Sequence, residues 1–129
     1  MTRSWLILVL CALVGSVRAS GHHSFASYYS EDQTVSIEGI LVELDYRNPH
    51  AFVHLLAQDN RGQMQRVSAE WASPARLSRE GVARDTLKPG DRLIVTGSPS
   101  RDPAEYQMHL KGMQRVSDGW KWVAGDQFR

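Results

Sequence analysis

The sequence predicts an all-β domain with one short helix, folded as a small five-stranded Greek-key barrel of the OB type. Three observations support this prediction: segments in which apolar and polar residues alternate, one helix start between the third and fourth of these segments, and a glycine that interrupts the first. A β-sandwich would need about seven strands and no helix in the middle of the chain. The length of 129 residues suits a single domain with one core.

The predicted barrel is preceded by a segment with the layout of a secretory signal peptide. Arg3 supplies a positive charge, and small residues follow the apolar run from Trp5 to Val14. A transmembrane helix needs about 20 apolar residues, so this run is too short to span a bilayer. We expect cleavage after Ala19, with cleavage after Gly21 as the alternative. The sequence therefore predicts a periplasmic or secreted protein that is not inserted in a membrane once the signal is removed.

The predicted mature chain consists of an N-terminal segment over 20–33 and the barrel domain over 34–129. Removal of residues 1–19 takes away two arginines and no acidic residue, which leaves 13 basic and 14 acidic side chains. A chain so close to neutral lacks the basic surface of a nucleic-acid binder, and we exclude that class. The single cysteine, Cys11, is removed with the signal. A hydrophobic core, and not a disulfide, must therefore stabilise the domain.

Residues 34–47 predict the first strand. Apolar side chains recur on one face at Ile40, Val42, Leu44 and Tyr46, as in a half-buried strand. We therefore expect Val42 and Leu44 in the barrel interior. Gly39 interrupts the pattern, which predicts a bulge or a sharp bend at that point.

Turn and capping signals place the other elements. Asn48-Pro49 ends the first strand, Ser73-Pro74 is an N-cap followed by proline at the first helical position, and Gly81 ends the helix. Asp118-Gly119 makes the last hairpin turn. The predicted elements are strands over 50–57 and 63–72, a helix over 74–80, strands over 92–97 and 104–116, and a short final strand over 120–123.

Three histidines form the candidate metal site. His22 and His23 lie at or near the predicted new N-terminus, and His50 follows the Asn48-Pro49 turn. If Ser20 is the first residue, its amine, two backbone nitrogens and the His22 ring offer the square of four nitrogens that Cu(II) favours. If His22 is first, its amine and ring chelate copper and His50 supplies a further nitrogen. The sequence thus predicts a copper-like ion at His22, His23 and His50; the alternative is that the His22-His23 pair belongs to a solvated tail.

The other two histidines are expected outside this site. His54 shares a strand face with His50, but four residues of regular strand separate them by about 13 Å, too far for one ion. We expect a partly buried His54 that is hydrogen-bonded to the backbone. His109 alternates with Glu105, Gln107 and Lys111, which predicts that it faces water. Met108, Trp71 and Trp122 are expected in the core.

The sequence favours a protein that is not an enzyme. It contains no cysteine nucleophile in the mature chain, no GxSxG or HExxH motif and no glycine-rich phosphate loop. The carboxylates Glu38, Glu43 and Asp45 are expected to be solvated. Glu70, beside Trp71, is the one acidic residue that stands out.

The motifs HHSF at 22–25, NPHA at 48–51 and LKPGD at 87–91 resemble those of a family of short exported bacterial proteins, which is known only as a domain of unknown function. The resemblance implies export and a shared constellation of His22, His23 and His50, and it implies no activity. Two hypotheses follow. The protein is a metal-binding module with a copper-like ion, or it binds a small non-metal ligand or a periplasmic protein while its histidines are structural.

Overall fold

The computed structural model describes residues 25–125. The predicted signal peptide, His22 and His23 lie outside this range. Within it, no helix is long and apolar enough to cross a membrane. In chain order the elements are α1 (Phe25–Tyr28), β1 (Val35–Asp45), β2 (Phe52–Gln58), β3 (Met64–Glu70), α2 (Pro74–Arg79), β4 (Arg92–Pro99), β5 (Gln107–Arg115) and β6 (Lys121–Val123).

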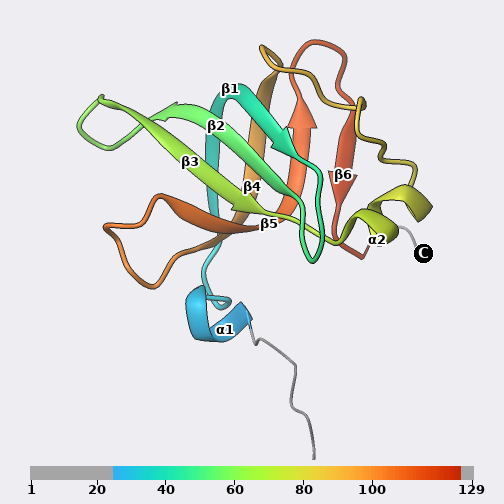
Figure 1. Cartoon of the computed structure of the whole chain (residues 1–129). Coiled ribbons are helices and arrows are strands. Elements are labelled where there is room, and N and C mark those ends of the chain that lie inside the picture. Colours follow the sequence, from blue (N-terminus) through green and yellow to red (C-terminus); the bar gives the residue numbers. More distant parts are fainter. Residues whose placement is uncertain (1–24, 126–129) are drawn as a thin grey trace, which may run out of the picture.

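Five of the strands close into a barrel (Figure 1). The sheet order is β3-β2-β1-β4-β5-β6, and neighbouring strands in this order are antiparallel. A parallel pairing between β3 and β5 closes the barrel, and the short β6 extends the sheet beyond β5. This closed mixed barrel confirms the predicted fold class. The single-turn helix α1 is an addition, because four residues are too few to produce a helical pattern in the sequence.

A bulge in β1 changes which residues face the interior. The pairing of β1 with β2 shifts between Leu41 and Glu43, so Val42 is an extra residue in the strand. Before the bulge Leu41 is 1% exposed and Ile40 is 42% exposed, which reverses the face that the sequence predicted for Ile40. After the bulge Val42 and Leu44 are both half-buried, and of the two it is Leu44 that packs against the core as predicted.

Gly39, where the sequence predicted the bulge, has a different role. It pairs with Ala57 on one side and Leu93 on the other without a register shift. A Cβ atom built at Gly39 would lie 2.6 Å from the carbonyl oxygen of Leu56. A side chain at this position would therefore force the two strands apart, and glycine allows their close approach.

Helix α2 closes one end of the barrel. Ser73 caps it as predicted, accepting a hydrogen bond from the Arg76 amide, and Gly81 follows its end with φ of +80°. Leu77 of this helix is fully buried in the core. Trp71 and Trp122 are also buried, with ring centroids 5.2 Å apart in an edge-to-face arrangement. The core positions predicted for both tryptophans are confirmed.

Candidate functional site

The candidate site lies on the outer face of the seam where β3 and β5 meet. Three residue pairs form this seam, and the last of them brings Glu70 beside His109. Helix α1 lies against the same region, below the barrel in Figure 1, and Tyr29 after the helix forms a bridge with Ser100. The seam therefore gathers side chains from α1, β3, β5 and the turn before β2.

His50 is oriented by Glu70. Its Nδ1 lies 2.6 Å from Glu70 Oε1, and the Tyr29 hydroxyl donates to Glu70 Oε2 at 2.6 Å. Burial and then the hydrogen bond to Glu70 raise the pKa of Tyr29 far above its ordinary value, so it stays a hydrogen-bond donor. When Glu70 is ionised its oxygens only accept hydrogen bonds, and His50 Nδ1–H is then the donor. In the neutral ring with this tautomer, the other ring nitrogen, Nε2, carries the lone pair.

His109 has a carboxylate partner of its own. Its Nδ1 lies 2.8 Å from Glu31 Oε1, and Lys111 Nζ lies 3.1 Å from Glu31 Oε2. Burial opposes ionisation of Glu31, but the hydrogen bonds from His109 and Lys111 outweigh it and lower the pKa of this carboxyl. The His109 side chain is 19% exposed, so the prediction that it faces water is wrong. The alternation of polar residues placed His109 correctly on the outer face of β5, but α1 and Glu31 cover this part of that face.

The Phe25 ring connects the two imidazoles. It stacks on His109 with centroids 3.9 Å apart and planes 2° apart, and on His50 at 5.4 Å and 29°. A pocket of about 220 Å³ is lined by Phe25, His50 and His109 together with Trp71 and Trp122. A second pocket of about 320 Å³ is lined by Phe25, His50, Tyr29 and Glu70. His50 therefore lines space on two sides.

The site differs in part from the set predicted from the sequence. His50 lies in it, whereas His22 and His23 fall outside the described residues. Within 25–125, no group of three or more His, Cys, Asp or Glu side chains is arranged to hold a metal ion. His54 lies on the outer face of β2 with its Nδ1 2.9 Å from Ser68 Oγ, so its partner is a side chain and not the predicted backbone group.

Sequence reasoning singled out Glu70 but missed Tyr29, Glu31 and His109 as members of the cluster. One local signal was available. Phe25 and Tyr29 are four residues apart, a spacing that places both rings on one side of a helical turn. No local signal joins Glu31 to His109, because they are 78 positions apart in the chain.

Fold and site together define a small OB-type barrel protein with a cluster of aromatic rings and imidazoles over its closing seam. The chain belongs to a family of unknown function, DUF6152, which it matches over residues 9–109. This match confirms the predicted membership of a family of unknown function, and its span includes the His50 turn and reaches His109. No curated protein matches the chain.

Proposed function

We propose that the protein is an exported metal-binding module that holds a copper-like ion through His50 together with His22, His23 or both. The observation that supports this most directly is the Tyr29–Glu70–His50 chain of hydrogen bonds. Histidines that bind metals typically donate their second ring N–H to a carboxylate or carbonyl, which sets the tautomer and the ring orientation. Glu70 does this for His50 and leaves Nε2 as the ligand atom.

The covalent chain limits how far the N-terminal histidines can lie from His50. Phe25 stacks on the His50 ring, and only Ser24 separates His23 from Phe25. Two residues of extended chain span about 7 Å, so the Cα atom of His23 can be no farther than that from the Cα atom of Phe25. Contact between Phe25 and His50 thus favours a site shared by His50 and the residues that precede Phe25.

The type of donor favours copper over zinc. A processed N-terminus adds a free amine and backbone nitrogens to the imidazoles, and such nitrogen sets suit the tetragonal geometry of Cu(II). Cysteine, the usual ligand of structural zinc sites, is absent from residues 20–129. The module would serve to buffer, deliver or sense the ion in the periplasm or outside the cell.

Calorimetric titration of Cu(II) into mature protein tests the proposal. Two forms, beginning at Ser20 and at His22, cover both cleavage sites. We expect one equivalent of bound copper, weakened at least about tenfold by His22→Ala and by His50→Ala. His54→Ala is the matched control, because it removes an imidazole from the same part of the chain and should leave binding unchanged. Absence of copper uptake by both forms, or equal affinities of the His50→Ala and His54→Ala proteins, would overturn the assignment.

The contacts of Phe25 favour a second candidate function, in which the histidines serve only to dock α1 on a module that binds a non-metal ligand. Stacking on His50 and His109 buries one face of each imidazole against the helix. In this case Phe25→Ala and His50→Ala would both speed hydrogen exchange at the amides of Tyr29 and Glu31. Copper binding, if present, would be the same in the His50→Ala and wild-type proteins.

A further inference from the structure

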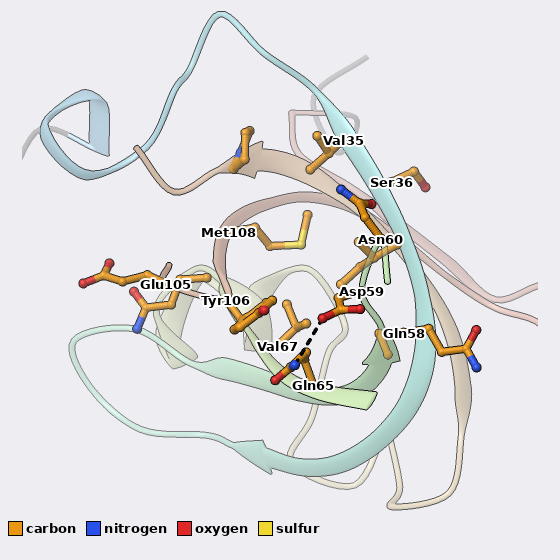
Figure 2. Close-up of a pocket in the computed structure, with 14 residues that line it drawn as sticks. Val35, Ser36, Gln58, Asp59, Asn60, Gln65, Val67, Glu105, Tyr106 and Met108 are labelled. Carbon is orange, nitrogen blue, oxygen red and sulfur yellow. Dashed lines mark hydrogen bonds between the residues drawn. The ribbon is translucent and has the colours of Figure 1, made fainter. Parts of the chain in front are cut away.

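The end of the barrel opposite α2 contains an open pocket. It has a volume of about 410 Å³ and lies where β2 ends and where β3 and β5 begin (Figure 2). Met108 and Val67 form its apolar floor, and Figure 2 shows the Met108 side chain in the middle of the opening. Met108 is buried and Val67 is half-buried. Mouths of β-barrels are common ligand sites, and this volume is within the usual range of about 300–1,000 Å³.

The rim of this mouth is acidic. Among the lining residues that the structure describes, the charged ones are Asp59 and Glu105, and none is Lys, Arg or His. Arg61 lies outside the pocket, 75% exposed, with its guanidinium 3.8 Å from the Asp59 carboxylate. Tyr106, 37% exposed, adds an aromatic face from the loop between β4 and β5.

Asp59 is a fixed anion. Its side chain is only 9% exposed. Its Oδ1 accepts hydrogen bonds from the backbone N–H groups of Gln63 and Arg61, and its Oδ2 accepts one from the Gln65 side chain at 3.2 Å, as Figure 2 shows. The Gln63 hydrogen bond is the main reason that the pKa of Asp59 is below its ordinary value. The carboxylate therefore keeps its charge at the edge of an apolar pocket.

We propose that the open mouth binds a small organic cation, an amine carried on an apolar body. The apolar body would lie on Met108 and Val67, and the ammonium group would face Asp59. The Glu105 carboxylate, which points away from Met108 in Figure 2, adds negative charge at the rim. The Tyr106 ring adds a surface for a cation–π contact. Charge complementarity favours this class, because the described lining of the pocket contains two carboxylates and no basic side chain. The site uses no histidine and is independent of the proposed metal centre.

Three probes of similar shape and different charge test the proposal: 2-phenylethylamine, 2-phenylethanol and phenylacetate. Each is titrated into the mature protein, with binding followed by calorimetry and by the NMR signals of the Met108 methyl group and the Tyr106 ring. We expect saturable binding of the amine with shifts at both residues, weaker binding of the alcohol and the weakest binding of the carboxylate. Added salt should weaken only the amine. No saturation by the amine at about 10 mM, or equal binding of all three probes, would overturn the proposal.

Single charge removals identify the residues responsible. Asp59→Asn should weaken amine binding about two- to fivefold, the usual effect of a partly solvated ion pair. Glu105→Gln, whose carboxylate points away from the opening, should weaken it measurably but less, and both variants should leave alcohol binding unchanged. Glu105 is exposed, so Glu105→Gln keeps the test valid even if Asp59→Asn disturbs the hairpin. Glu43→Gln, on the outer face of β1, is the matched control. His50→Ala should leave amine binding intact, so failure of the metal proposal and failure of this one are distinguishable.

Discussion

The two ends of the barrel are built differently. At one end α2 and the residues after it insert Leu77, Val82 and Leu87 into the core, and Trp71 packs edge-to-face against Trp122. The end is also tied by polar contacts, since the Tyr46 hydroxyl lies within hydrogen-bond distance of the Pro74 and Val82 carbonyl oxygens. At the opposite end no helix covers the barrel in the described part of the chain, and a pocket of about 410 Å³ remains between β1, β2, β3 and β5.

The two ends of this single-core domain therefore have different roles: one stabilises the fold and the other leaves room for a ligand. Buried apolar side chains supply most of the stability of a small domain that has no disulfide. The filled end can therefore stabilise the fold while the open end keeps apolar surface in contact with solvent. The cluster of His50, Glu70 and Tyr29 lies on the wall between the two ends, at the seam of the barrel.

The largest expected effect comes from removing a side chain at the filled end. Leu77→Ala would leave a cavity where packing is complete, and we expect it to lower the free energy of unfolding by about 2–5 kcal/mol. Val67→Ala, at the floor of the open mouth, removes methyl groups that already border empty space and should cost about 1 kcal/mol. Urea unfolding of both variants measures the difference. Equal losses would contradict the view that one end carries more of the stability.

Removing the polar contacts that Glu80 makes between the end of α2 and β6 is expected to lower the free energy of unfolding by a smaller amount. Glu80 accepts hydrogen bonds from Arg76 Nε at 2.9 Å and from Trp122 Nε1 at 2.7 Å. Glu80→Ala would leave the buried indole N–H without a partner, which should cost about 1–3 kcal/mol in unfolding experiments. Arg79→Ala on the exposed side of the same helix is the control and should change stability by less than about 0.5 kcal/mol. A loss in the control as large as that of Glu80→Ala would mean that removing any charged side chain from this segment destabilises the protein, and that the indole contact is not the cause.

The order of the elements was predictable from the sequence, but which β1 side chains face the barrel interior was not. Turn and capping residues such as Asn48-Pro49 and Ser73-Pro74 act locally, so they place the elements correctly. Ile40, Leu41 and Val42 are three consecutive apolar residues, and alternation then fits either face. The bulge determines which of these residues face the interior, and it depends on the pairing of β1 with β2, which is a tertiary contact.

The candidate site was predictable only where one residue carried a local signal. His50 stood out because it follows a proline turn, and Glu70 because it is an acidic residue beside a core tryptophan. Their contact spans 20 positions, and the contact between Tyr29 and Glu70 spans 41. Parallel closure of β3 on β5 creates the seam where these side chains meet, and a single sequence carries no sign of which residues will oppose one another across it.

The smallest expected effect is a pH dependence at the filled end. The Glu80 side chain is only 6% exposed. Burial opposes its ionisation, but the hydrogen bonds from Arg76 and Trp122 lower its pKa below the ordinary value of 4.5. In the unfolded chain the group returns to that value and binds protons more readily than in the folded state. Stability from Glu80 is therefore complete above pH 4.5 and is lost as the pH falls through the lower folded pKa.

Glu80→Gln isolates this contribution, because the amide can still accept the indole hydrogen bond but does not titrate. Urea unfolding of wild type and variant at a series of pH values should show wild type more stable above pH 4.5 and the difference shrinking in acid. All other carboxyl groups titrate in both proteins, so their contributions cancel. A difference that stays constant or grows in acid would mean that the Glu80 charge does not strengthen its contacts with Arg76 and Trp122.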